Sequence, residues 1–306
     1  MDPTQQPDDL TGHIDVDGWF GGSGGHGDVR MGTWNRETQP TKIAVKLLRA
    51  RGDSLQKPAR FAKRLRREIK VWKQLKHENI VPLLGTVMCY SAHSEPGPSI
   101  PVMGMVSPWF ENGSLLQVIS DSGKHLTVLN RLQMLGDVAA GLSYLHSKGI
   151  IHGDLTGVST ANVLIDDAGR ACLVDFGLSF IKAEFEGTSY WSSIMGGAIR
   201  WRAPELLPPL AGDETDFKPN LTSACDIYSY GSVMLHVMSE KIPYYNIGHD
   251  LSVFVQILQG HRPQRPQSPL LIDAYWEFIA WCWDLTPTSR PSAEMVKMSL
   301  VDFIGK

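Results

Sequence analysis

The spacing of apolar residues changes once along the chain, and this change limits the folds that the sequence can adopt. From Gly18 to about Val106 the apolar residues form short, strand-like runs that one helical pattern interrupts. From Ser114 onward the patterns are mostly helical. A chain of 306 residues is long enough for two lobes. We therefore expect an α+β fold with a small antiparallel-sheet lobe containing one main helix, followed by a larger, mostly helical lobe.

The same pattern divides the chain into three segments. Residues 1–15 are polar and predict a loose N-terminal tail. Residues 16–110 would form the sheet-rich N-lobe, and residues 111–306 the helical C-lobe. Within the N-lobe, the stretch from Ser91 to Pro101 separates two apolar runs and contains Ser, Pro and Gly, which is typical of an exposed loop.

Composition favours an ordinary soluble globular protein. The net charge of −3 does not point to nucleic acid or to an anionic membrane, and no stretch of about 18 apolar residues is present that could span a bilayer. The four cysteines are scattered, without the C-x-x-C spacing of a zinc site. Together with an N-terminus that lacks a signal-peptide pattern, reduced cysteines fit a cytoplasmic protein. Oligomeric state is not readable from the sequence.

A basic segment over residues 57–76 predicts the main helix of the N-lobe. It carries nine Lys and Arg residues, but its apolar stripe has helical spacing and the charges lie off that stripe, so a solvated helix face is favoured over a nucleic-acid patch. The stripe consists of Phe61, Leu65, Ile69, Trp72 and Leu75. Glu68 falls on the same inward face, where a buried carboxylate requires a cationic partner.

A second helix is predicted from about Asn130 to Lys148, with Gly149 placed to cap its end. Its apolar stripe comprises Leu132, Leu135, Val138, Ala139, Leu142 and Leu145.

Glycines near the N-terminus form the pattern G-x-G-x-x-G-x-V, with Gly22, Gly24, Gly27 and Val29 at its fixed positions. Glycine lets a backbone approach a phosphate closely, but a plain glycine-rich turn and the dinucleotide-binding fingerprint share this spacing. The fingerprint opens a helix, whereas the residues from Asp28 to Trp34 have a strand pattern. A strand-like run, Ile43-Ala-Val-Lys46, then ends in a lysine.

Further motifs follow in a fixed order. They are His152-Gly-Asp154-Leu, Asn162-Val-Leu-Ile, Val174-Asp-Phe-Gly177, Arg202-Ala-Pro-Glu205, Cys225-Asp-Ile-Tyr-Ser-Tyr-Gly231 and Ser289-Arg-Pro291. From about Gly18 to the C-terminus, the chain resembles a eukaryotic protein kinase, most closely the tyrosine-kinase-like branch of serine/threonine kinases. The resemblance implies a bilobal kinase fold that binds ATP and Mg²⁺ between its lobes.

The resemblance also implies a role for each matching N-lobe residue. Gly22, Gly24 and Gly27 would cover the phosphates, and Lys46 would hold them while pairing with Glu68. The adenine would lie between Val29 and Ala44 on one side and Leu164 on the other. Ser107 matches the small gatekeeper, and the hinge corresponds to Pro108, Trp109 and Phe110, with the Phe110 backbone donating to the nucleotide.

In the C-lobe, the resemblance implies that Asp154 orients the substrate hydroxyl and accepts its proton, and that Asn162 and Asp175 bind Mg²⁺. Asp226 would brace the catalytic loop, and Glu205 would form a buried pair with Arg290. A stacked apolar spine would include Trp72, His152 and Phe176.

Three departures from the family pattern stand out. Seven residues, Leu155 to Ala161, separate Asp154 from Asn162 where the family has four, and removing Val158, Ser159 and Thr160 would restore the spacing. Gly153 replaces an arginine that reads an activation-loop phosphate. Thr156 stands where serine/threonine kinases usually have a lysine near the γ-phosphate. Hydroxyl residues that could be modified in the activation loop are Thr188, Ser189, Tyr190, Ser192 and Ser193.

The function expected from these residues is transfer of the γ-phosphoryl group of ATP to Ser or Thr of a protein substrate, with Tyr not excluded. The lengthened loop and Thr156 motivate an alternative, a pseudokinase that binds nucleotide or acts as a scaffold. A small-molecule kinase on a related fold is disfavoured, because Ala203-Pro204-Glu205, Arg290 and the helical region after Glu205 build a platform for protein substrates.

Overall fold

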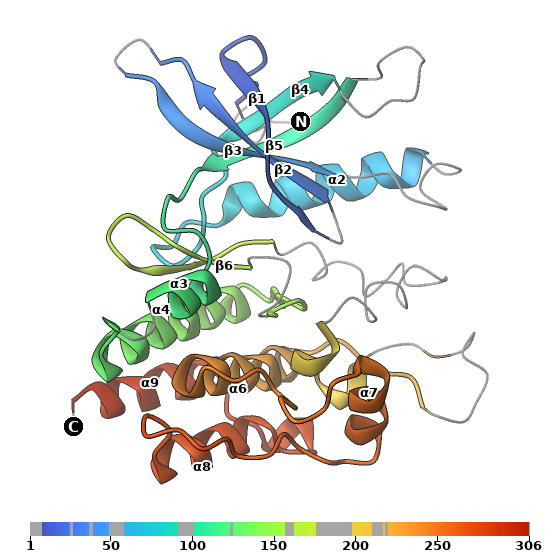
Figure 1. The fold of residues 1–306 in the computed structure, drawn as a ribbon. Coiled ribbons are helices and arrows are strands. Elements are labelled where there is room, and N and C mark those ends of the chain that lie inside the picture. The colour runs from blue at the N-terminus through green and yellow to red at the C-terminus, as the bar shows by residue number, and fades with distance from the viewer. Residues whose placement is uncertain are drawn as a thin grey trace. The chain divides into compact units, whose positions relative to one another are not determined.

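A computed structural model describes residues 8–24, 27–36, 39–48, 58–90, 101–122, 125–156, 162–175, 198–209, 217 and 220–305. The chain divides into two compact units, Met1–Trp109 and Phe110–Lys306 (Figure 1). The first contains a five-stranded sheet and the second is mostly helical, so the predicted α+β fold and the order of its parts are confirmed.

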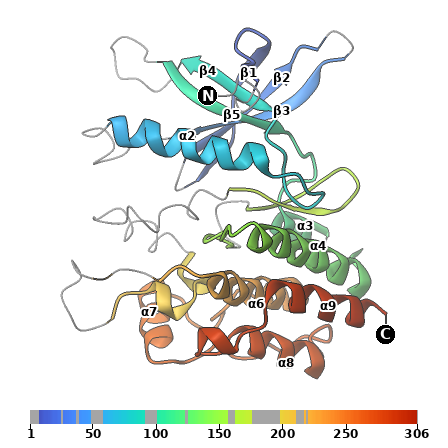
Figure 2. The same cartoon turned by 180° about the vertical axis from the view of Figure 1, so that it is seen from behind.

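The first unit is an antiparallel sheet with one long helix along one of its faces (Figures 1 and 2). The strands follow the order β1-β2-β3-β5-β4 across the sheet. The elements are β1(Ile14–Gly24), β2(Gly27–Trp34), β3(Thr41–Leu48), α2(Pro58–Gln74), β4(Gly85–Tyr90) and β5(Pro101–Pro108).

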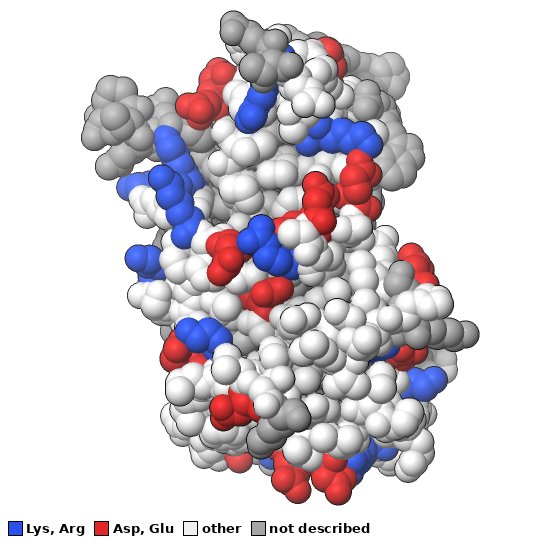
Figure 3. Space-filling view, turned by 90° about the vertical axis from the view of Figure 1, so that its left-hand side faces the viewer, with Lys and Arg blue, Asp and Glu red and all other residues white. Residues whose placement is uncertain are grey.

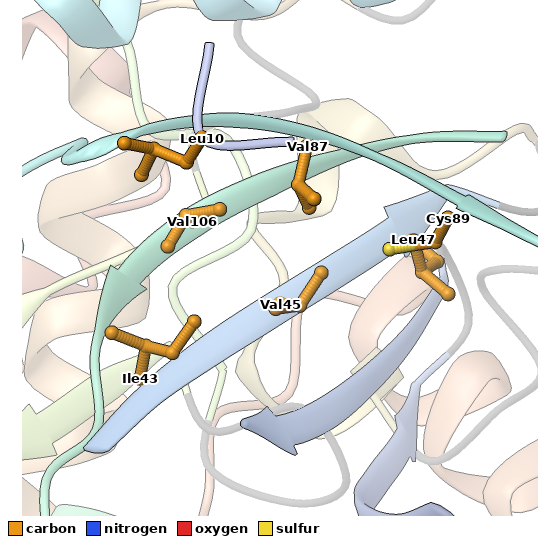
Figure 4. Packing of buried hydrophobic residues seen from close by; sticks show 7 residues of the cluster. All are labelled: Leu10, Ile43, Val45, Leu47, Val87, Cys89 and Val106. Atoms are coloured by element: carbon orange, nitrogen blue, oxygen red, sulfur yellow. The ribbon is translucent and has the colours of Figure 1, made fainter. Parts of the chain in front are cut away.

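Strand β3 explains why the two faces of the sheet differ. Successive side chains of a strand point to opposite faces, so Ile43, Val45 and Leu47 share one face while Ala44 and Lys46 share the other. The first three join a buried cluster with Leu10, Val87, Cys89 and Val106 (Figure 4). The alternation therefore reserves one face for the core and leaves the other for Lys46.

The described residues just before β1, from Asp8 to His13, pair with the sheet, although the sequence predicts a loose tail over residues 1–15. Asp9 forms a parallel bridge with Thr86 of the edge strand β4. The Leu10 N–H donates to the Thr86 carbonyl at 2.8 Å, and the Thr86 N–H donates to the Asp8 carbonyl at 2.9 Å. Leu10 is buried among the core residues of the sheet. This segment covers the outer edge of β4, which satisfies backbone groups that an edge strand otherwise exposes.

Helix α2 has the amphipathic character that its sequence predicts. Leu65, Ile69 and Trp72 are buried, and so is Leu75 just after the helix. Lysines and arginines such as Arg66 and Lys70 are exposed, which matches a solvated helix face. Phe61 lies among the residues whose side chains are not described. On the face drawn in Figure 3, basic and acidic side chains lie interspersed.

The second unit contains six α-helices in its described part, together with a two-stranded hairpin. Helix α4 packs against α9 and α6, and α6 packs against α8 (Figure 2). The elements are α3(Leu115–Ser122), α4(Val128–Ser147), β6(Val163–Ile165), β7(Ala171–Leu173), η4(Ala198–Trp201), η5(Pro204–Leu206), α6(Ser223–Ser239), α7(Asp250–Leu258), α8(Asp273–Cys282), η6(Pro287–Ser289) and α9(Ala293–Ile304).

Helix α4 illustrates how local sequence sets an element of this unit. It begins two residues before the predicted start because Thr127 and Asn130 form a capping box. Every residue of its predicted stripe is buried. Gly149, with φ of 69°, follows its last turn and donates its N–H to the His146 carbonyl, as predicted for a cap.

In the described part of the chain, no helix has the length and apolar character needed to cross a membrane.

The burial of Leu10 leads to a test of the N-terminal segment. Replacing Leu10 by Ala should lower the free energy of unfolding by about 2 kcal/mol or more, because a buried leucine leaves a cavity in the sheet core. Urea denaturation measures the change. Leu129→Ala is the matched control, since Leu129 is 47% exposed and its loss should change stability by less than about 0.5 kcal/mol. Equal effects of the two substitutions would contradict the packing of Leu10.

Candidate active site

The glycine motif lies where β1 and β2 join. Gly22 is opposite Val29 and Gly24 is opposite Gly27 in the antiparallel register, so all three glycines lie at the same end of the hairpin. Gly25 and His26 are outside the described residues. A dinucleotide-binding fingerprint must be followed by a helix, but strand β2 follows these glycines, so the motif is not such a fingerprint.

Lys46 and Glu68 meet inside the first unit, as predicted. The Lys46 Nζ lies 3.3 Å from the Glu68 Oε1, and the two side chains are 10% and 8% exposed. Burying a lone carboxylate on α2 would be strongly unfavourable, so the lysine of β3 accounts for this inward glutamate. The pair also fixes the direction of the Lys46 side chain. A lysine without a partner would sample many directions.

The other residues expected near the nucleotide lie on the same sheet face as Lys46. In the ladder, Val29 is opposite Lys46 and Ala44 is opposite Ser107, and directly opposed residues share a face. Ser107 is buried. Pro108 ends β5, yet the Trp109 N–H still donates to the Lys42 carbonyl at 3.3 Å.

Two expected nucleotide contacts belong to the second unit. Phe110 begins that unit, and its carbonyl accepts the Gly113 N–H at 3.1 Å in a turn. Leu164 lies in β6 opposite Cys172 and is partly buried.

The segment that carries Asp154 is held from helix α6 by one carboxylate. Asp226 is 1% exposed and accepts the backbone N–H groups of His152 and Gly153, each at 2.8 Å. Its Oδ2 also lies 2.8 Å from the His146 Nε2. The predicted brace by Asp226 is therefore confirmed, and His146 of α4 joins it.

Gly153 has a conformational reason for being glycine. Its φ is 77°, in the left-handed region that costs a residue with a Cβ about 1–2 kcal/mol. The Asp226 contact to its N–H holds the backbone there. Glycine thus removes strain at this position while it also removes the side chain that the family uses to read a phosphate.

Asp154 is contacted through both of its carboxylate oxygens. The Arg202 guanidinium lies 3.1 Å from Oδ1, and the Asn162 amide donates to Oδ2 at 3.3 Å. The same amide also donates to the Asp154 carbonyl. The Asp154 N–H in turn donates to the His152 Nδ1 at 3.3 Å. Asn162 is therefore brought to Asp154 despite three additional residues between them, while Val158–Thr160 themselves lie outside the described residues.

Asn162 and Asp175 emerge from the same end of the β6–β7 hairpin. Val163 pairs with Leu173, and the Val174 N–H donates to the Asn162 carbonyl at 3.0 Å, so Asp175 follows next in the chain. Asp175 has φ of 68°, a conformation that is uncommon outside glycine and is often found at functional sites. Within the described part of the chain, the buried Asn162 Oδ1 has no hydrogen-bond partner. A hard cation prefers such oxygen ligands, so these two side chains fit Mg²⁺.

The segment around Glu205 is anchored by a bidentate ion pair. The Arg290 Nη1 and Nη2 lie 2.6 and 2.9 Å from the two Glu205 carboxylate oxygens, which confirms the predicted pair. Arg290 also donates to the Ala224 and Asp284 carbonyls. Four residues before Glu205 in the sequence, the Trp201 carbonyl accepts a hydrogen bond from the Ser229 hydroxyl at 2.9 Å.

The contact between Arg202 and Asp154, like that between His146 and Asp226, is a feature of the site that the sequence did not predict. Arg202 stands inside the Arg202-Ala-Pro-Glu205 motif, but the motif predicts a role only for Glu205. Phe176, Gly177 and the activation-loop hydroxyl residues Thr188, Ser189, Tyr190, Ser192 and Ser193 fall outside the described residues, so the spine and the loop stay expectations.

Comparison with known proteins decides the family. A family model described as protein tyrosine and serine/threonine kinase matches residues 21–300. The chain belongs to the protein kinase family. Its motifs, from the glycine hairpin to Arg290, all lie within the matched range.

Curated relatives carry serine/threonine kinase descriptions. The chain is 32% identical over 273 residues to a probable serine/threonine-protein kinase, drkD, of Dictyostelium discoideum, covering 89% of this chain and 18% of that protein. It is 30% identical over 299 residues to the serine/threonine-protein kinase mos of Patiria pectinifera, covering 94% and 75%. A probable serine/threonine-protein kinase of Arabidopsis thaliana, SIS8, is 30% identical over 285 residues, covering 91% and 24%. The chain thus spans less than a fifth of the length of drkD.

The positive φ of Gly153 gives a stability prediction for the catalytic loop. Gly153→Ala should lower the free energy of unfolding by about 1–2 kcal/mol, because alanine is strained in this conformation. Chemical denaturation measures the loss. Gly248→Ala is the control, since a Cβ there meets nothing within 4 Å and its φ is not in the left-handed region. The explanation fails if Gly153→Ala is no more destabilising than Gly248→Ala.

His236 links the stability of the second unit to pH. It lies on α6, with its ring centroid 6.3 Å from that of Trp201. Burial lowers the pKa of His236 from 6.5 to about 4, against the opposing charge of Glu240. Between these two pH values the unfolded chain binds the proton more readily than the folded chain, so stability falls as pH falls through this window.

Replacing His236 by Phe should therefore make the free energy of unfolding less dependent on pH between about 6.5 and 4. The pKa shift corresponds to a loss of at most about 3 kcal/mol across the window in the parent chain. Urea titrations at several pH values compare the parent chain with the variant. Parallel curves for the two proteins would show that His236 does not carry this linkage.

Proposed function

We propose that the chain transfers the γ-phosphoryl group of ATP to serine or threonine hydroxyls of protein substrates. The observation that carries this proposal is the contact of Asn162 with Asp154. The lengthened loop favours a pseudokinase only if it displaces Asn162, since a displaced asparagine would leave the metal site incomplete. Holding Asn162 beside Asp154 preserves the arrangement on which transfer depends, because a displacement of about 1 Å can lower a rate by ~10²-fold.

Residues of the first unit would bind the nucleotide. Gly22, Gly24 and Gly27 would bring backbone close to the phosphates, and Lys46, oriented by Glu68, would contact the α- and β-phosphates. The face that carries Lys46 also presents Val29 and Ala44, which would contact the adenine. Ser107, Pro108, Phe110 and Leu164 would complete its surroundings.

Residues of the second unit would bind the metal and the hydroxyl. Asn162 and Asp175 would hold Mg²⁺, which when bound neutralises charge on the phosphates. Asp154 would orient the substrate hydroxyl and accept its proton. The hydroxyl oxygen forms a bond to the γ-phosphorus, the bond from that phosphorus to the β–γ bridging oxygen breaks, and ADP leaves with the electron pair. The products are ADP and a phosphoprotein.

The choice of serine and threonine rests on the relatives, whose descriptions name serine/threonine kinases. Tyrosine stays an alternative, because Thr156 matches neither the serine/threonine nor the tyrosine version of the catalytic loop. A cytoplasmic location is consistent with four free, buried cysteines.

Asp154→Asn tests the proposed reaction. The amide cannot accept the hydroxyl proton, so kcat for phosphorylation of a generic protein substrate should fall by ~10²–10⁴-fold. Binding of Mg·ATP, measured by calorimetry, should stay nearly unchanged. Phosphoamino-acid analysis of the product should show phosphoserine and phosphothreonine.

Asp167→Asn is the matched control, because Asp167 is an exposed aspartate in the turn between β6 and β7, and among the described residues it has no hydrogen bond or ion pair with a candidate group. It should transfer phosphate at the parent rate. Parent-level turnover by Asp154→Asn would remove Asp154 from the reaction. Binding of Mg·ATP by the parent chain without any phosphoprotein would instead establish the pseudokinase alternative.

A further inference from the structure

Arg202 points a buried positive charge at the candidate base. Its Nη2 lies 3.1 Å from the Asp154 Oδ1, and the two side chains are 4% and 6% exposed. Removing either charge from such a buried pair leaves the other without compensation, which is strongly destabilising. The ion pair is thus a fixed part of the environment of Asp154.

The neighbouring arginines Arg200 and Arg290 bind other partners, so the contact with Asp154 is particular to Arg202. Arg200 donates to Asp250 and to the carbonyls of Pro243, Tyr244 and Ile247. Arg290 holds Glu205. Both of these arginines join structural elements to one another, whereas Arg202 contacts the carboxylate proposed to receive a proton.

The backbone around Arg202 is held on both sides. Its own N–H donates to the Ile199 carbonyl at 3.2 Å, and the Trp201 carbonyl accepts the Ser229 hydroxyl. After it, the Leu206 N–H donates to the Ala203 carbonyl, and Glu205 is fixed by Arg290. Because hydrogen bonds hold the backbone on both sides of Arg202, its guanidinium is preorganised. It need not reorganise during a reaction.

Because Thr156 is neutral, phosphoryl transfer would need positive charge from another residue near Asp154. Phosphoryl transfer depends mainly on positioning and on positive groups that stabilise charge on the transferred phosphoryl oxygens. Two residues after Asp154, the catalytic loop carries the neutral hydroxyl of Thr156, which is buried. The charge that a lysine would supply from this position is therefore missing from the loop itself.

We propose that Arg202 is the positioning residue that replaces this lysine. It holds the Asp154 Oδ1 while Asn162 holds the Oδ2, and it brings positive charge to the site where the phosphoryl group is transferred. Each carboxylate oxygen has more than one acceptor position, so Asp154 can still accept a hydrogen bond from the substrate hydroxyl. This inference rests on the proposed kinase activity.

A charge-relocation experiment tests the inference. Arg202→Met should lower kcat by ~10²-fold or more, as removal of a preorganised donor does, with a change in KM for ATP of less than ~3-fold. Adding Thr156→Lys to that variant returns a cation to the catalytic loop and should raise kcat at least ~10-fold. A residue with a merely structural role would not be rescued in this way.

Arg200→Met is the matched control, because it removes a buried guanidinium from the same segment without touching Asp154. Its activity should not rise when Thr156→Lys is added. Circular dichroism confirms that each variant is folded. If Arg202→Met does not fold, Arg202→Lys replaces it: this variant keeps the charge without the planar fork, and its kcat should lie below that of the parent and rise with Thr156→Lys.

The outcomes separate the inference from the proposed function. An active parent with Arg202→Met at parent kcat, or a folded and impaired Arg202 variant that Thr156→Lys does not improve, overturns the role of Arg202 alone. A parent chain that binds Mg·ATP but makes no phosphoprotein overturns the proposed function and the inference with it. Rescue confined to the Arg202 background supports both.

Discussion

The carboxylate of Asp226 fixes the backbone on which the proposed chemistry depends. It is almost completely buried on α6, and it accepts the N–H groups of two consecutive residues, His152 and Gly153. Two hydrogen bonds to adjacent amides define both the position and the direction of the chain, and Asp154 is the next residue. Charged acceptors form stronger hydrogen bonds than neutral ones, which suits a group that must hold a loop in place.

From this anchor, successive contacts define the surroundings of Asp154. Asn162 binds both its side chain and its carbonyl, and the β6–β7 hairpin connects Asn162 to Asp175. Arg202 approaches from a segment that Arg290 and Ser229 hold independently. The first unit follows the same principle, since Glu68 on α2 orients Lys46 on β3. In both units a buried charge is placed by a partner on another element.

Much of this could be predicted from the sequence because the signals are local. The inward position of Glu68 follows from helical spacing, and its need for a cation follows from burial. The stripe of α4 and the cap at Gly149 likewise depend on residues close in sequence. Family resemblance added the pairs that join distant segments, including Asp226 with the loop and Glu205 with Arg290.

The remaining features depend on contacts between distant segments that no local pattern encodes. Leu10 lies in a polar stretch, and only pairing with β4 reveals that it completes the core. Arg202 is 48 residues from Asp154, and its motif gives no sign of the direction of its side chain. The effect of three extra residues on Asn162 could not be judged from spacing, because a longer loop costs little entropy and can return the chain to the same place.

The account therefore depends on whether the longer loop permits transfer. The most direct measurement compares Mg²⁺-dependent phosphate transfer from ATP to a protein substrate by the chain itself and by a variant that lacks Val158, Ser159 and Thr160. If Asn162 reaches Asp154 in both, both should transfer phosphate, with kcat values within ~10-fold of each other. Transfer by the shortened variant alone would contradict the account, because it would show that the additional residues displace Asn162 from its working position.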